Sequence, residues 1–189
     1  MYKEKKPHFY FVPLIGFYNG FRVNEICQLH IEDIRQEKGI WCFDINENIN
    51  SKGELVKSVK NLPTKRVVPM NPELIKLGFI DYYHKIVSLK NTRVFPLLNY
   101  SRDGYGKVVS DFFTRSKHLF ITHQEKKSFH STRHNFIQQL RNSKIDDHRR
   151  RALTGRGDDD IDFDYGESES FSLQDLLKAI KKVKYPEIL

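Results

Sequence analysis

Cationic side chains occur in this sequence at points where turns or helix starts are expected, and such groups suit phosphate chemistry. The first is Arg22, which follows Asn19-Gly20, opens a segment with helical apolar spacing, and precedes Glu25 by three residues. A guanidinium at a helix start can hold a phosphate through two parallel hydrogen bonds, and a carboxylate one turn away can support it. Arg22 is therefore a candidate anion-binding residue, and the alternative interpretation is an ordinary surface arginine.

His130 and Arg133 form a second candidate pair. They are three residues apart and share one face if their segment is helical. This spacing lets an imidazole and a guanidinium address one phosphate together. A metal site is disfavoured here, because the arginine would repel the cation and no carboxylate accompanies these residues.

Two further segments carry groups of the same kind. A lysine-rich hairpin is expected over residues 54–69, and from it an ammonium group could reach a leaving oxygen. Leu153-Thr154-Gly155-Arg156 precedes an acidic loop and then Tyr165, which stands between small and acidic residues and is expected to display its hydroxyl. Either segment alone could equally be a solvated surface. The cations of the hairpin are Lys57, Lys60, Lys65 and Arg66.

Taken in order, these segments resemble the catalytic domain of the tyrosine recombinases, the phage integrase family. The family pattern is an Arg in Gly-x-Arg-x-x-Glu, a Lys on a β-hairpin, His-x-x-Arg, Leu-x-Gly followed by His or Trp, and a Tyr nucleophile. The resemblance covers nearly the whole chain, and it includes residues 24–29, Asp33 and Arg66-Val67-Val68-Pro69. The matching site residues are Arg22, Lys60, His130, Arg133, Arg156 and Tyr165.

The resemblance implies an integrase or site-specific recombinase that cuts and rejoins DNA through a covalent 3′-phosphotyrosyl intermediate, without a metal or other cofactor. Tyr165 would attack the phosphorus, while Arg22 and Arg133 would hold the two non-bridging oxygens. A ring of cations suits this reaction, since it favours the phenolate of a tyrosine whose ordinary pKa is near 10.

The other three roles are also implied by the resemblance. Lys60 would protonate the leaving 5′ oxygen as general acid, and it lies at a better distance from Arg66 than the neighbouring hairpin lysines do. His130, with Arg156, would accept the tyrosine proton or donate to the phosphate. Arg156 departs from the family pattern, and an arginine cannot exchange protons near neutral pH. We therefore expect retained but altered activity.

The composition agrees with a polyanionic partner. The chain of 189 residues has 32 Lys and Arg against 24 Asp and Glu, a net charge of +8, so double-stranded DNA is the first candidate and an anionic membrane the second. No apolar stretch approaches the roughly 20 residues of a membrane span, and the charged residues 1–7 do not resemble a signal peptide. We expect a cytoplasmic protein of bacterial or phage origin with no membrane partner, in which Cys27 and Cys42 are reduced and buried.

The elements that must position the site are mostly helical, with one small antiparallel sheet, so the expected fold class is α+β. Apolar spacing predicts two helices joined by a Gly turn over residues 9–29. Alternating apolar residues predict strands within residues 39–49 and 54–69. Further helices are expected over residues 72–87, 108–119, 131–140 and 172–183, with a loop over 99–107.

The expected domain organisation is a linker remnant over residues 1–7 and one catalytic domain over residues 8–189, with an amphipathic C-terminal helix at 172–184. Family members usually carry an N-terminal core-binding domain that completes a clamp around DNA, and we expect it to be absent here. The C-terminal helix could pack on its own domain or dock on a neighbouring protomer. We expect exchange within a tetramer on DNA and a monomer without DNA.

Two other functions stay open. The chain could be a non-catalytic DNA-binding module derived from a recombinase, which would bind DNA without cleaving it. It could also be a metal-dependent nuclease that uses the acidic loop, although consecutive aspartates in a loop point in different directions and usually meet water. Inhibition of cleavage by EDTA would support that nuclease, whose candidate ligands are Asp158, Asp159, Asp160 and His148.

Overall fold

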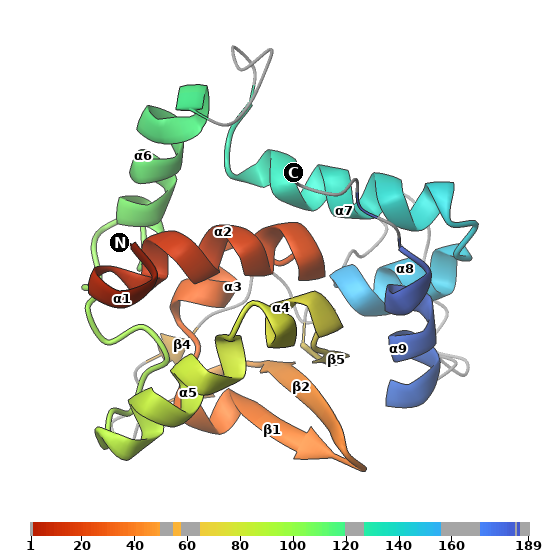
Figure 1. Ribbon diagram of the computed structural model, residues 1–189, viewed down its shortest axis with the longest axis horizontal. Coiled ribbons are helices and arrows are strands. Elements are labelled where there is room, and N and C mark those ends of the chain that lie inside the picture. Colours follow the sequence, from red (N-terminus) through yellow and green to blue (C-terminus); the bar gives the residue numbers. More distant parts are fainter. Residues whose placement is uncertain are drawn as a thin grey trace. The chain divides into compact units, whose positions relative to one another are not determined.

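The computed structural model describes residues 2–49, 55–57, 65–119, 127–155, 171–183 and 185 (Figure 1). The chain divides into two compact units that alternate along the sequence. Unit 1 comprises Met1–Glu32 and Pro72–Phe136, and unit 2 comprises Asp33–Asn71 and Ile137–Leu189. The described elements combine many helices with a small antiparallel sheet, which confirms the α+β class. No described helix is both long and apolar enough to cross a membrane.

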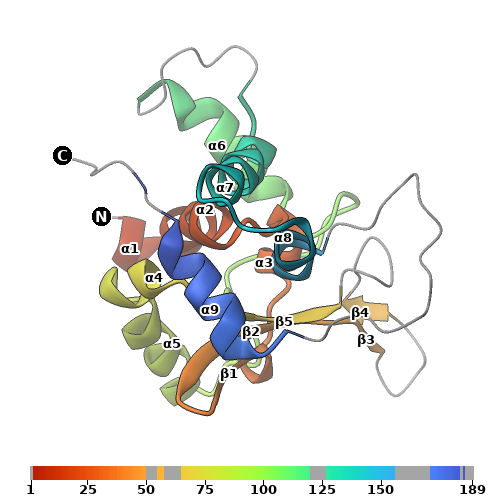
Figure 2. The same cartoon turned by 90° about the vertical axis from the view of Figure 1, so that its right-hand side faces the viewer.

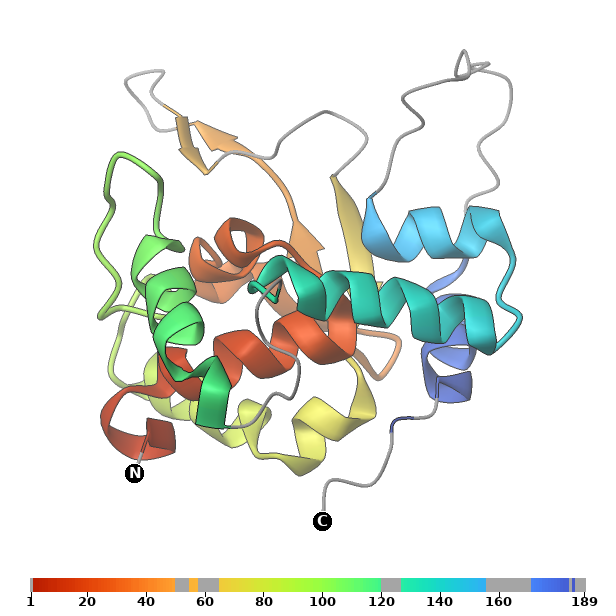
Figure 3. The ribbon, with the colours of Figure 1, turned by 90° about the horizontal axis from the view of Figure 1, so that it is seen from above.

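Unit 1 is built around helix α2 (Pro7–Asn19), which contacts several other helices of the unit. It buries Phe11, Val12 and Ile15 completely, because it is apolar around most of its circumference. The first half of α7 lies alongside α2 in Figures 1 and 3. The other described helices of the unit include α1 (Tyr2–Lys5), α3 (Val23–Cys27), α4 (Pro72–Lys76), α5 (Phe79–Ser88), α6 (Lys107–Ser116), the 3₁₀ helix Lys117–Leu119 and the start of α7 (His130–Asn142).

Two segments of unit 1 differ from the sequence prediction. One helix is predicted over residues 72–87, but the structure has α4 and α5, separated by Gly78. Gly78 adopts the left-handed conformation (φ 84°), which ends the first helix and which glycine adopts without steric cost. Residues 2–5, within the expected linker, form the exposed helix α1, and Pro7 opens α2 and is buried.

Unit 2 contains a three-stranded antiparallel sheet in the order β1-β2-β5. Strands β1 (Ile34–Glu37) and β2 (Ile40–Ile45) form a tight hairpin, whose turn residues Lys38 and Gly39 both have positive φ, as a type I′ turn requires. Strand β5 (Arg66–Pro69) pairs with the other edge of β2. A separate antiparallel pair joins β3 (Asn48–Ile49) and β4 (Leu55–Lys57).

Two helices of unit 2 contact strand β5, namely α8 (Asp147–Thr154) and α9 (Leu173–Lys182). Ser172 caps α9, since its hydroxyl accepts a hydrogen bond from the Asp175 amide at 3.1 Å. The apolar face of α9 buries Leu176, Ala179 and Ile180. Figure 2 shows α9 beside the sheet, so in this structure the C-terminal helix packs within its own unit.

Candidate active site

Arg22 lies on the turn between α2 and α3, and the shape of this turn depends on Gly20. Gly20 ends α2 in the left-handed conformation (φ 69°), and its amide donates to the Gly16 carbonyl at 3.1 Å. A Cβ at this position would lie 2.3 Å from Cδ1 of Phe136. Two separate constraints therefore require glycine at position 20: the left-handed backbone conformation and the Phe136 ring that packs against the Cα.

Glu25 fixes the Arg22 side chain. One carboxylate oxygen of Glu25 accepts from the Arg22 backbone amide at 2.9 Å, and the other accepts from Arg22 Nη1 at 2.7 Å. The Glu25 side chain is only 3% exposed, whereas Arg22 is 27% exposed. The carboxylate is thus held in the protein while the guanidinium reaches the surface, as the three-residue spacing indicated.

His130 and Arg133 lie in the first turn of α7, so the helical spacing expected from the sequence is present. His130 is exposed, and its ring is 4.6 Å from the ring of His134. Arg133 is 4% exposed, and its Nη1 donates to the Gly20 carbonyl at 2.8 Å. One helical turn thus carries an accessible imidazole and a guanidinium tied to the α2–α3 turn.

The structure therefore brings Arg133 to the turn that carries Arg22. The carbonyl that Arg133 binds belongs to Gly20, two residues before Arg22. Close packing supports this arrangement, because a Cβ on Gly16 would lie 2.8 Å from the Phe129 ring and 2.9 Å from Thr132 Oγ1. Two guanidinium groups anchored to one turn, with an imidazole nearby on α7, form a site that suits a phosphate diester.

A half-buried arginine that the sequence analysis missed, Arg93, supports the C-terminal end of α3. Arg93 donates through Nη2 to the Cys27 carbonyl at 2.7 Å and through Nη1 to the Leu98 carbonyl at 2.9 Å. Its guanidinium also lies 3.5 Å from the centre of the Tyr105 ring. Burial lowers the pKa of Arg93 from its ordinary value. No periodicity or motif marks this residue, because its partners are backbone carbonyls, one of them 66 positions away in the sequence.

Three of the expected site residues, Lys60, Arg156 and Tyr165, lie outside the described residues. Their immediate surroundings are described in part. Lys65, five positions after Lys60, is ion-paired with Glu47 at 2.9 Å. The hairpin expected over residues 54–69 is not formed by the described strands, because β5 pairs with β2 and β4 pairs with β3. Arg66 Nε donates to the Leu153 carbonyl at 3.2 Å, which fixes the Leu-x-Gly segment to strand β5 within unit 2.

The metal-nuclease interpretation receives no structural support within the described part of the chain. No group of three or more His, Cys, Asp or Glu side chains there could hold a metal ion. The candidate ligands Asp158, Asp159 and Asp160 lie outside the described residues. Both cysteines are buried as expected, and burial raises the pKa of each thiol, most strongly that of Cys27.

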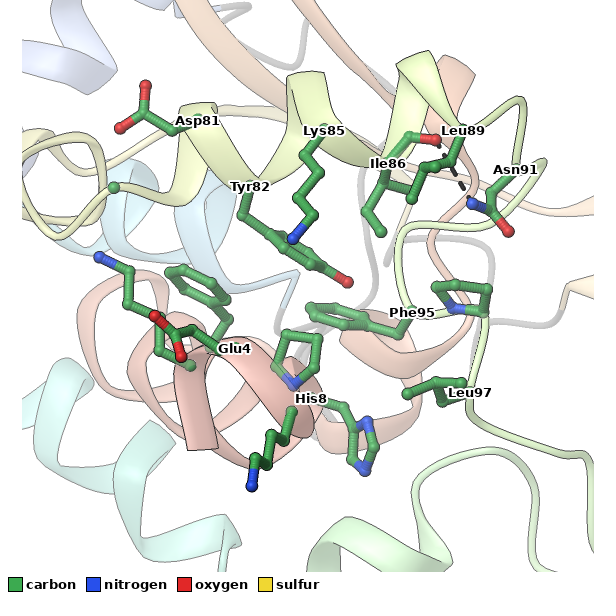
Figure 4. A pocket seen from close by; sticks show the side chains of 16 residues that line it. Glu4, His8, Asp81, Tyr82, Lys85, Ile86, Leu89, Asn91, Phe95 and Leu97 are labelled. Atoms are coloured by element: carbon green, nitrogen blue, oxygen red, sulfur yellow. Dashed lines mark hydrogen bonds between the residues drawn. The ribbon is translucent and has the colours of Figure 1, made fainter. Parts of the chain in front are cut away.

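A cavity of about 630 Å³ lies elsewhere in unit 1, among α1, α5 and residues 95–97 (Figure 4). Its lining includes His8 and Tyr82 but neither Arg22 nor the α7 residues of the candidate site. The Tyr82 hydroxyl donates to the Val94 carbonyl at 2.6 Å, so this phenol has a structural role. The cavity is therefore separate from the candidate site residues Arg22, His130 and Arg133.

Comparison with known proteins identifies the family. No curated protein matches the sequence at a significant level. A model of the phage integrase family matches residues 8–158, a range that includes Arg22, Lys60, His130, Arg133 and Arg156 and ends before Tyr165. This match covers most of the chain. The chain therefore belongs to the phage integrase family, whose members are DNA-binding site-specific recombinases of the tyrosine class.

Proposed function

We propose that residues 8–189 form the catalytic domain of a recombinase that cuts DNA with Tyr165 and rejoins it without a metal ion. The observation that carries the proposal is the hydrogen bond from Arg133 to Gly20, which ties one candidate phosphate ligand to the turn of the other, Arg22. Family membership supplies the substrate class.

In the proposed reaction, the Tyr165 hydroxyl attacks the phosphorus and loses its proton to His130, with Arg156 donating a hydrogen bond to the phosphate. The bond from phosphorus to the 5′ oxygen breaks, and Lys60 gives that oxygen a proton. The phosphate stays bonded to tyrosine, so its bond energy is conserved. Reversal of these steps with a new 5′ hydroxyl reseals the DNA without ATP.

The two site arginines stabilise the extra negative charge that the five-coordinate phosphate gains. Such groups are most effective when they are oriented before the reaction, because no rearrangement is then needed in the transition state. The nearly buried Glu25 orients Arg22, and the Gly20 carbonyl orients Arg133. In other phosphoryl-transfer enzymes metal ions supply this charge, and here the arginines take their place.

Arg156 stands where the family usually has His or Trp. It can donate a hydrogen bond to the phosphate but cannot relay the tyrosine proton near neutral pH. We therefore expect Arg156→His to change the rate of covalent-complex formation while leaving DNA affinity within a few-fold. Single-turnover rates of the two proteins measure the effect, and equal rates would show that the position plays no part in proton transfer.

The experiment that tests the proposal traps the covalent intermediate. Wild type and Tyr165→Phe are incubated in EDTA with nicked duplexes carrying candidate attachment sites, and denaturation-resistant protein–DNA complexes are counted. We expect a complex with wild type and none with Tyr165→Phe. A complex that survives in Tyr165→Phe would assign another nucleophile, and cleavage abolished by EDTA would favour the metal nuclease.

The second candidate, a non-catalytic DNA-binding module, rests on the substitution at Arg156. It predicts that both proteins bind the same duplexes and that neither forms a covalent complex. Each nicked duplex is therefore also tested for binding at several salt concentrations, since phosphate contacts weaken steeply with salt. Binding without a covalent complex, on a duplex that a related active recombinase cleaves, would favour this module.

The proposed assembly is a tetramer on DNA that exchanges C-terminal helices. In this structure the apolar face of α9 packs on β5 and α8 of its own chain. Exchange would place the same face on a neighbour and would therefore need no new type of contact. Light scattering should find a monomer without DNA, and a stable tetramer in its absence would contradict this proposal.

A further inference from the structure

The loop between Leu98 and α6 is held in a single shape by its own hydrogen bonds. The Gly104 amide donates to the Ser101 carbonyl at 2.9 Å, and the Ser101 hydroxyl donates to the Gly104 carbonyl at 2.8 Å. Gly104 has a φ of 87°, which closes this turn in a conformation that other residues rarely adopt. Residues 101–104 therefore form a defined turn at the surface of unit 1.

Asn24 fastens this loop to α3, beside the turn that carries Arg22. Its Oδ1 accepts from the Gly106 amide at 2.7 Å, and its Nδ2 donates to the Asp103 carbonyl at 3.3 Å. A Cβ on Gly104 or on Gly106 would lie within 2.8 Å of this same amide oxygen. The fit leaves no room for a side chain, and Asn24 is only two residues from Arg22.

Three planar side chains, those of Arg93, Tyr105 and Tyr100, contact one another in sequence along the loop. The Arg93 guanidinium lies over the Tyr105 ring, and the edge of Tyr100 meets Tyr105 at a centroid distance of 5.2 Å. Arg93 is itself bonded to the Cys27 carbonyl, so these side chains are anchored on α3. Tyr100, the last of the three side chains, is 71% exposed, and Arg102, two residues later, is also exposed. In Figures 2 and 3 the green loop that precedes α6 lies beside α3.

We propose that Tyr100 and Arg102 bind the DNA backbone at phosphates beside the one held by Arg22, and that Asn24 is the residue that positions them. Tyrosine hydroxyls and arginines are typical phosphate ligands in protein–DNA complexes. This inference rests on the proposed function, because it takes the Arg22 turn as the place of the reacting phosphate. A rigid loop fastened two residues from Arg22 sets the register of the DNA on the site.

The charges of the loop define the kind of contact. Asp103 is adjacent to Arg102, and Lys107 is ion-paired with Asp111 at 2.6 Å, so the loop has little net charge. The loop would therefore contact DNA phosphates through directional hydrogen bonds and would add little long-range electrostatic attraction to DNA. Arg102→Ala should lower the salt dependence of binding by about one phosphate contact, whereas Tyr100→Phe should weaken binding without changing that slope.

The test is a binding scan with duplex DNA in which single phosphates are replaced by neutral methylphosphonates. Wild type should lose affinity at the scissile phosphate and at one or two phosphates next to it. In Tyr100→Phe and Arg102→Ala the losses at the adjacent phosphates should disappear, while the loss at the scissile phosphate remains. Asn24→Ala should show the same selective change, because it removes the hydrogen bonds that hold the loop at Asp103 and Gly106 against α3.

Lys85→Ala is the matched control, since it removes one exposed positive charge from α5 and should leave the wild-type pattern unchanged. Thermal melts verify that each variant is folded. A wild-type pattern in both Tyr100→Phe and Arg102→Ala would overturn the inference and leave the proposed function intact. The scan measures DNA binding, whereas covalent trapping measures cleavage. Failure of the proposed function is therefore distinguished from failure of this inference.

Discussion

The α2–α3 turn and the β1–β2 hairpin use the same kinds of residue with different results. Each contains a glycine with positive φ, Gly20 at 69° and Gly39 at 79°, and each has an arginine that is ion-paired with one carboxylate or more. A Cβ on Gly20 would lie 2.3 Å from Phe136, whereas a Cβ on Gly39 would meet nothing within 4 Å. The first turn is packed into the core of unit 1, and the second is open.

The carboxylates differ in the same way. Arg22 pairs with one carboxylate, that of Glu25, whose side chain is 3% exposed. Arg35 pairs with two carboxylates, those of Asp44 and Glu37, whose side chains are 25% and 39% exposed. An exposed ion pair is screened by water and fixes its partners weakly. Two carboxylates also outweigh the charge of Arg35. A single buried carboxylate therefore orients Arg22 more firmly than two exposed carboxylates orient Arg35.

The largest expected effect is on catalysis. Arg22→Ala should slow covalent-complex formation about 10²–10³-fold, because one preorganised donor to the transition state is lost. Arg35→Ala should leave the rate unchanged and alter stability by less than about 1 kcal/mol. Single-turnover trapping and urea unfolding of both variants measure these effects.

Arg22→Ala also leaves the nearly buried Glu25 carboxylate without its partner, which should destabilise the protein. The reaction rate of this variant is therefore measured well below the melting temperature of the variant. Arg141→Ala, an exposed arginine on α7, controls for loss of one positive charge. Equal rates for Arg22→Ala and Arg35→Ala would show that pairing with a buried carboxylate has no consequence for catalysis.

The glycines give the next largest effect. Gly20→Ala should lower the free energy of unfolding by about 2–5 kcal/mol, because left-handed strain adds to the clash with Phe136. Gly39→Ala has the strain alone and should cost about 1–2 kcal/mol. Denaturant unfolding measures both, and the double variant Gly20→Ala with Phe136→Ala should separate the clash from the strain. A cost at Gly39 as large as at Gly20 would show that packing does not distinguish the turns.

The smallest effect is a dependence on pH at the opposite end of α2. His8 is buried, and burial, followed by the charge of Lys6, lowers its pKa from the ordinary value near 6.5. The unfolded chain therefore binds the proton more tightly, so stability should fall as the pH drops below about 6.5. Melting temperatures at pH 7.5 and 5.5 should differ more for wild type than for His8→Phe. The exposed His84→Phe should keep the wild-type difference.

The sequence predicted those elements whose apolar pattern or capping residues differ clearly from the adjoining sequence. The apolar run before Asn19-Gly20 indicated α2 and its end, and Ser172 with Asp175 indicated the start of α9. Strand β1 was missed because Ile-Arg-Gln-Glu has one apolar residue, and its pairing with β2 supplies the structure. Helix α8 was missed for a similar reason. Its polar residues are held by the Asp146 cap and by ion pairs such as Arg150–Asp147.

The candidate site was predictable only where its contacts are local. Three-residue spacing indicated that Glu25 supports Arg22 and that His130 shares a helix face with Arg133, and the structure has both arrangements. The bond from Arg133 to Gly20 joins distant segments, and no spacing rule encodes it. Arg93 was missed because carbonyl partners leave no pattern in a sequence. The roles of the site residues stay predictions, and Lys60, Arg156 and Tyr165 lie outside the described residues.

The bond from Arg133 to Gly20 also has a consequence for folding, because it spans 113 positions of the chain. A contact of this separation forms only after a long loop has closed, and closure costs chain entropy before the contact returns any stability. We therefore expect the site arginines to meet late in folding, after the local helices have formed. A nascent chain that has left the ribosome only as far as α6 contains Arg22 without Arg133, so the two candidate phosphate ligands come together only after α7 has packed on α2.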